Sequence, residues 1–119
     1  MVDVEGPGKR VRIYIGEHDK AAGSHKALWE DVLSLLRREG AAGATMFRGL
    51  AGFGAHSHLH LARLADVAPD LPVLIEWIDT PDQVERLLPE VCRLVTSGTV
   101  TVDDLTIVKH TPRAAQPPH

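Results

Sequence analysis

The sequence predicts an α+β fold in which a four-stranded antiparallel sheet carries two helices on one face. Apolar residues alternate with a period of two in some segments and recur at helical spacing in others, which gives the order strand, helix, strand, strand, helix, strand. The connections between most segments are short, as expected when consecutive elements pack together. A chain of 119 residues, 44% of them hydrophobic, is the size of one domain.

The first strand is predicted over Arg10–Ile15. Val11, Ile13 and Ile15 alternate with two arginines and a tyrosine, which indicates one buried and one mixed face. The nine residues before it have little apolar content, so we expect 1–9 to be a flexible leader and 10–110 to be the folded domain.

The first helix is predicted over Ser24–Glu39. Ser24 is a candidate N-cap because its hydroxyl can accept a hydrogen bond from an amide of the first turn. Gly40 can adopt the left-handed conformation that ends many helices. The apolar stripe between them consists of Leu28, Val32, Leu35 and Leu36.

The second and third strands are predicted over 44–51 and 71–78. The third is apolar on both sides except at Glu76, which indicates a sheet that is covered on both faces. Two helices can cover only one of these faces. We therefore expect further copies of the chain to cover the other, in a homo-oligomer.

The second helix begins with a clear N-terminal signal. Thr80 is a candidate cap, Pro81 suits the first helical position, and the side chain of Gln83 can return a hydrogen bond as in a capping box. Pro89 lies inside the following apolar stripe, so a kink or local break is expected there.

The last strand is predicted over 99–109, with a bulge or bend at Asp103-Asp104. Residues 111–119 contain little apolar material and are expected to form a disordered tail. With right-handed crossovers, the six elements close as a ferredoxin-like βαββαβ fold.

Composition excludes several classes of protein. The formal net charge of −3 argues against a general nucleic-acid binder, which is usually basic. The sequence has no apolar run of the roughly 20 residues that a membrane-spanning helix needs. The single cysteine, Cys92, excludes an internal disulfide and is typical of a reducing compartment, so we expect a cytoplasmic protein.

Three segments carry a resemblance to a known family: GATMFRGLAGFG at 43–54, DLPVLIEWIDTPDQV at 70–84 and SGTVTVDDLTIVK at 97–109. Together they resemble the PII-like proteins of the domain-of-unknown-function family DUF190, which are distantly similar to the nitrogen regulatory protein PII. The resemblance implies a homotrimer that binds adenine nucleotides in clefts between subunits. It also implies that the loop after the second strand, here residues 55–70, contacts partner proteins.

The resemblance places candidate ligand-binding residues around the exit from the second strand. Gly52 and Gly54 match the glycines at the base of the PII signalling loop, where backbone lies beside the nucleotide. PII proteins typically have arginine and glutamine at the next two positions, where this chain has Ala55 and His56, so a basic phosphate contact is missing.

These glycines have an alternative interpretation from the residues alone. Gly52-Phe53-Gly54 either lines a ligand or permits a sharp bend with Phe53 packed in the core. Arg48 precedes this turn within the second strand. It either pairs with a carboxylate such as Glu76 or points into an intersubunit cleft and receives an anion, for which a guanidinium is well suited. The polar loop 17–20 can join such a cleft.

His56, His58 and His60 share one side of an extended segment. One hypothesis is that His56 or His58 contacts a ligand phosphate. A second hypothesis is a divalent-metal site on all three, as in a metal-binding or metal-tolerance protein, because imidazole is a good ligand for zinc, copper and nickel. The third is an edge strand with solvated histidines and buried leucines.

No catalytic motif is recognisable, and we assign no catalytic residue. A small barrel enzyme of ferredoxin-like fold is a third alternative. The preferred interpretation is a regulatory protein that binds a small anionic ligand, with a nucleotide as the preferred candidate, and uses the loop 55–70 as a partner-contacting switch.

Overall fold

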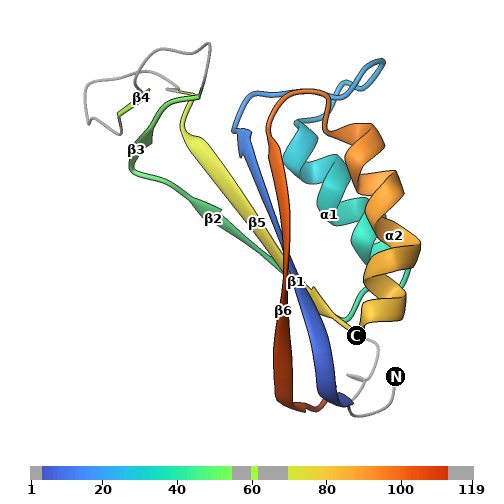
Figure 1. The fold of residues 1–119 in the computed structure, drawn as a ribbon. Helices are drawn as coiled ribbons and strands as arrows, with labels where there is room; N and C mark the ends of the chain where they lie inside the picture. Colours follow the sequence, from blue (N-terminus) through green and yellow to red (C-terminus); the bar gives the residue numbers. More distant parts are fainter. Residues whose placement is uncertain (1–3, 55–59, 62–69, 113–119) are drawn as a thin grey trace, which may run out of the picture.

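A computed structural model describes residues 4–54, 60–61 and 70–112 of the chain. A four-stranded sheet has the order β2-β5-β1-β6, with every neighbouring pair antiparallel, and both helices lie on one side of it (Figure 1). This confirms the predicted ferredoxin-like fold. The elements are β1 (Val4–Gly16), α1 (Leu28–Arg38), β2 (Ala44–Arg48), β5 (Pro72–Asp79), α2 (Pro81–Leu94) and β6 (Thr99–His110).

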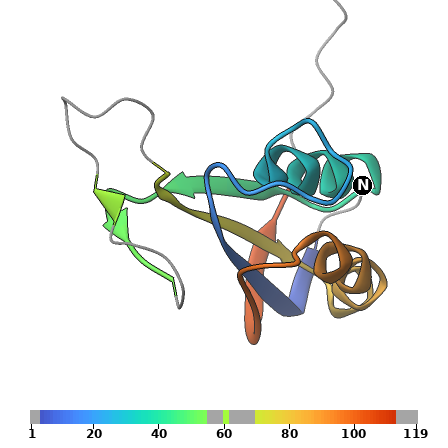
Figure 2. The same cartoon turned by 90° about the horizontal axis from the view of Figure 1, so that it is seen from above.

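Two further short strands, β3 (Ala51–Gly52) and β4 (His60–Leu61), pair with each other in a separate small sheet. They lie beyond the end of β2, well away from the two helices (Figure 2). The predicted second strand, 44–51, is therefore wrong in its last part. The chain leaves the main sheet after Arg48 and enters the small sheet at Ala51.

The core lies between the sheet and the helices. Alternate residues of β1 and β5 point to the helical side and are paired in register, for example Ile13 with Ile75 and Val11 with Trp77. Each of these four side chains is completely buried. Burial of a side chain of this size stabilises the fold by about 1.5–3 kcal/mol. The helices complete the core with Leu28, Val32, Leu35, Leu36, Val84, Leu87 and Val91.

The first strand is longer than predicted, because it begins at Val4 rather than Arg10. The prediction that residues 1–9 form a leader is thus wrong for 4–9, which pair with β6. Gly8 permits this pairing, since a Cβ atom there would lie 2.6 Å from the Ile107 side chain. Residues 1–3 and 113–119 of the predicted leader and tail lie outside the described residues.

The predicted bulge at Asp103-Asp104 is also wrong. Both aspartates lie in regular register with β1, where Arg10 and Lys9 oppose them and form ion pairs of 2.6 Å. The register shifts between Val4 and Gly6 instead. Opposite charges across neighbouring strands thus allow two consecutive aspartates in an ordinary strand.

The first helix begins later than predicted, at Leu28, with Ala27 as an N-cap that makes no side-chain hydrogen bond. Ser24 does not cap it. Its hydroxyl oxygen accepts from the Lys26 amide at 3.1 Å, in the turn that precedes the helix. The predicted end is confirmed, because Gly40 has a φ of 82° directly after the cap.

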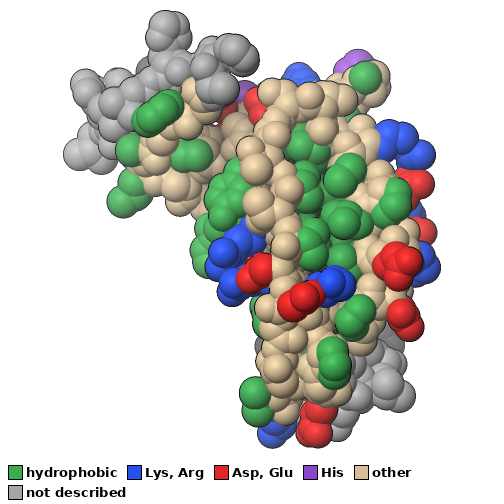
Figure 3. Space-filling view, viewed as in Figure 1, with side chains coloured by type: hydrophobic (Ala, Val, Ile, Leu, Met, Phe, Trp, Pro, Cys, Tyr) green, Lys and Arg blue, Asp and Glu red, His purple; other side chains and the backbone are tan. Residues whose placement is uncertain are grey.

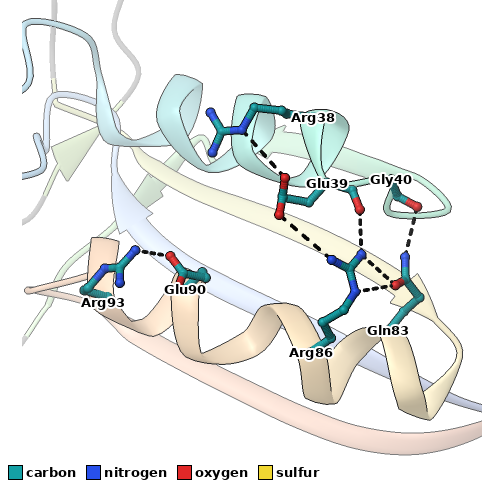
Figure 4. A network of polar contacts seen from close by, with 7 residues as sticks. All are labelled: Arg38, Glu39, Gly40, Gln83, Arg86, Glu90 and Arg93. Carbon is teal, nitrogen blue, oxygen red and sulfur yellow. Dashed lines mark hydrogen bonds and ion pairs between the residues drawn. The ribbon is translucent and has the colours of Figure 1, made fainter.

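The second helix begins as predicted, with the Thr80 side chain accepting from the Gln83 amide at 3.3 Å. The predicted return bond of the capping box is replaced by a contact between helices, in which Gln83 Nε2 donates to the Gly40 carbonyl at 3.0 Å. Arg86 donates to the Glu39 carbonyl at 2.6 Å, so both α2 side chains satisfy the end of α1 (Figure 4). The helix runs unbroken through Pro89.

The face of the sheet that the helices leave uncovered carries both apolar and charged side chains. Tyr14, Phe47 and Ile78 lie on it, and each is more than one-third exposed. Arg12 donates to Glu76 across this face at 3.2 Å. Figure 3 shows hydrophobic side chains on the left side of the sheet, with charged side chains of both signs directly below them. In the part of the chain that the structure describes, no helix is long and apolar enough to cross a membrane.

Candidate functional site

A groove of about 810 Å³ crosses the end of the sheet where β1 and β2 end and β5 and β6 begin. Its walls come from residues 14–16, 47–49, 51–54, 72–74 and 97–99, together with Asp19 and Asp70. Five separate segments therefore meet at one place. The groove has the size of an ordinary small-molecule site, for which about 300–1,000 Å³ is typical.

Close contact between the backbone after β2 and Pro72 forms one wall. The Gly49 amide donates to the Pro72 carbonyl at 2.7 Å. A Cβ atom at Gly49 would lie 2.7 Å from Pro72 Cγ, and one at Gly52 would lie 2.9 Å from the same atom. Glycine is needed at both positions, because any side chain would push the wall away from the proline.

Gly98 forms the opposite wall and was not anticipated from the sequence. Its φ is 143°, and a Cβ atom there would lie 2.5 Å from the Tyr14 carbonyl oxygen. The turn between α2 and β6 can thus lie directly against the end of β1. The Ser-Gly pair before β6 was a recognisable turn signal, but which segment it contacts depends on the tertiary fold.

Arg48 lies on the wall of the groove, but its predicted partner, Glu76, is wrong. Arg48 is paired in register with Val73, a core residue, whereas Glu76 lies on the opposite face of the sheet and pairs with Arg12. The carboxylate that Arg48 contacts is Glu17. Arg48 Nη2 and Nε each lie 2.8 Å from one of its two oxygens.

One residue of the polar loop 17–20, Asp19, lines the groove. The Asp19 carboxylate accepts from the Gly16 amide at 2.8 Å, and Asp70 accepts from the His18 amide at 2.9 Å. Both carboxylates also approach the open side of Gly16. Among the described residues that line the groove, Arg48 is the only cation, and Asp19 and Asp70 are the only anions.

The structure brings four of the predicted ligand-binding residues together. Arg48, Gly52, Phe53 and Gly54 all line the groove. Phe53 is 77% exposed, so the alternative in which it packs in the core is wrong.

Two of the three predicted histidines lie outside the described residues. His56 and His58 lie outside the described residues, and His60 is placed only as the strand partner of Gly52. Within residues 4–54, 60–61 and 70–112, no group of three His, Cys, Asp or Glu side chains could hold a metal ion. Histidine ligation therefore stays a prediction.

Comparison with known proteins gives consistent results. The family model DUF190, described as an uncharacterized ACR, matches residues 8–107. The UPF0166 protein MJ1524 of Methanocaldococcus jannaschii is 30% identical over 104 residues, which cover 85% of this chain and 92% of that protein.

Two solved structures of CPII from Thiomonas intermedia K12, a nitrogen regulatory PII-like protein, are also similar. The one bound to ADP and bicarbonate is 26% identical, covers 87% of this chain and 91% of that chain, and has a TM-score of 0.54. The one bound to ADP, AMP and acetate has 24% identity, the same coverage and a TM-score of 0.58, and supports the fold alone. The chain therefore belongs to the DUF190 family, and its fold is that of the PII-like proteins.

Proposed function

We propose that this protein is a cytoplasmic PII-like regulatory protein that binds an adenine nucleotide in the groove at the end of the sheet. The observation that carries the proposal is the placement of Arg48 on a groove that Gly49, Gly52 and Gly54 also line. A guanidinium can bind a phosphate at two points, and glycines in the wall let a ligand approach the main chain. CPII, which is bound to ADP in its structure, supports the choice of nucleotide.

The proposed assembly is a homotrimer with the ligand at the seams between subunits. Tyr14, Phe47 and Leu74 lie on the uncovered face of the sheet and also line the groove. A neighbouring subunit that packs against this face would also close the groove on one side. Ligand binding and subunit packing would then involve the same apolar side chains.

We propose that ligand binding changes the arrangement of the segment 55–70, which directly follows Gly52 and Gly54 of the groove. A ligand that contacts residues 52–54 would favour one arrangement of the segment over others, provided that it binds the two arrangements with different affinity. A partner protein would then recognise the favoured arrangement. Addition of ligand should therefore change the protection of this segment in hydrogen exchange.

Calorimetric titration with ADP, AMP and ATP tests the proposal. Saturable binding to the intact oligomer is expected, and Arg48→Ala should weaken it about ten- to hundredfold, since hydrogen bonds to charged groups contribute about 1.5–3 kcal/mol. Arg93→Ala is the matched control, because Arg93 pairs with Glu90 on α2 and does not line the groove. Absence of binding by all three nucleotides, or equal effects of the two variants, would contradict the proposal.

A further inference from the structure

The guanidinium of Arg48 already holds an anion. Its Nη2 and Nε each lie 2.8 Å from a different oxygen of Glu17. This two-point contact is the geometry that arginine offers to a phosphate or carboxylate ligand. We propose that Glu17 is an internal competitor that occupies Arg48 in the absence of ligand and thereby sets the affinity of the groove for anions. The inference rests on the proposed function and names a regulator of the same site.

Glu17 is the fixed member of this pair. Its amide donates to the Leu71 carbonyl at 2.9 Å, which ties the backbone to the segment before β5. Its side chain is 17% exposed, whereas that of Arg48 is 53% exposed. The long arginine side chain can therefore turn toward a ligand while the carboxylate stays in place.

The groove offers an anionic ligand few positive charges, so the pairing of Arg48 with Glu17 should weaken anion binding. Asp19 and Asp70 line the groove, and Arg48 is the only cation that the described residues contribute to its wall. Glu17 does not line the groove, yet its carboxylate pairs with the positive charge of Arg48. An anionic ligand can use Arg48 fully only if the guanidinium leaves Glu17.

Release of Arg48 leaves a largely buried carboxylate without its guanidinium. Among the described residues, the other basic group paired with Glu17 is His18, whose Nε2 lies 3.9 Å from a Glu17 oxygen. An uncompensated buried charge is unfavourable, so the exchange subtracts from the binding free energy of the ligand. Removal of the charge on Glu17 should therefore tighten binding, although Glu17 does not touch the ligand.

Titration of Glu17→Gln with ADP and with inorganic pyrophosphate tests this inference. Kd is expected to fall about two- to fivefold, the range for an ion pair that solvent screens, because the Arg48 side chain is 53% exposed. Glu17→Gln in an Arg48→Ala background should have no effect, because the competitor then has nothing to hold. Glu90→Gln is the matched control, since Glu90 pairs with Arg93 on α2.

Other outcomes separate the two proposals. If the unaltered protein binds ADP and Glu17→Gln binds it equally or more weakly, Glu17 merely orients Arg48, and this inference fails while the proposed function stands. If neither protein binds ADP or pyrophosphate, both fail. The Nε–H resonance of Arg48 gives a readout that needs no variant. It should shift when the unaltered protein is saturated with ADP, and an unchanged resonance overturns the exchange.

Discussion

The indole Nε1 of Trp77 donates to the Asp79 carboxylate at 3.0 Å, and both residues are buried at the end of β5. The same carboxylate oxygen accepts from the Ala42 amide at 2.8 Å, and the second oxygen accepts from the Thr80 amide at 2.8 Å. Asp79 thus joins the central strand, the connection after α1 and the start of α2. A buried carboxylate is tolerated here because its oxygens are satisfied.

Asp79→Asn should destabilise the fold by about 2–4 kcal/mol. An amide keeps the volume but has one acceptor oxygen instead of two, so it leaves at least one of the three donors without a partner, at a cost of about 1–3 kcal/mol each. Urea unfolding followed by circular dichroism measures the loss. Asp82→Asn, at an exposed position in the first turn of α2, is the control and should cost less than about 1 kcal/mol. Similar losses for the two variants would contradict the assigned role.

Gly98→Ala should disturb the groove as well as the fold. Its Cβ would lie 2.5 Å from the Tyr14 carbonyl oxygen at a φ of 143°, so the turn must move away from β1. We expect a loss of about 2–3 kcal/mol in the free energy of unfolding, together with weaker nucleotide binding. Gly23→Ala provides the comparison, because Gly23 also has a positive φ but no atom within 4 Å of the added Cβ. It should cost only about 1 kcal/mol and leave binding unchanged.

The pair formed by Arg10 and Asp103 should make stability sensitive to acid. The hydrogen bond from Arg10 lowers the pKa of the Asp103 carboxyl group below its ordinary value. The folded state therefore binds this proton less readily than the unfolded state, and the stabilisation is present above the unfolded pKa and is lost as pH falls through the folded pKa. Carbon-detected NMR should show the Asp103 carboxyl group titrating with a pKa below the ordinary range of an aspartate, and this pKa should rise in Arg10→Gln. If the pKa of Asp103 is the same in Arg10→Gln as in the unaltered protein, the explanation is wrong.

Phe47→Glu should weaken self-association. Phe47 is 49% exposed on the uncovered face of the sheet, and a carboxylate there would have to be desolvated between subunits. Light scattering over a concentration series should show a smaller mean mass than for the unaltered protein. Cys92→Glu introduces the same charge at an exposed position on α2, and its mass should stay that of the parent. If the unaltered protein is a monomer, the proposed trimer is wrong, and so is the proposal that a neighbouring subunit closes the groove.

Most of the fold could be read from local patterns. The alternation in β1, the threonine-proline start of α2 and the glycine after α1 each depend on residues that are neighbours in the chain, so the elements and their order were predictable. Element ends were less predictable. Val4–Lys9 has no apolar alternation of its own and becomes strand only because β6 offers it a paired edge.

The candidate site shows the same division. The sequence alone determined that a strand leaves the sheet through glycines beside Arg48, because a turn depends on residues that are adjacent in the chain. Only the tertiary structure decided that Glu17, rather than Glu76, is the partner of Arg48. The physical reason is the pleat of the sheet: it turns Arg48 and Glu76 to opposite faces, while the loop after β1 brings a carboxylate from 31 positions away in the chain to the correct side.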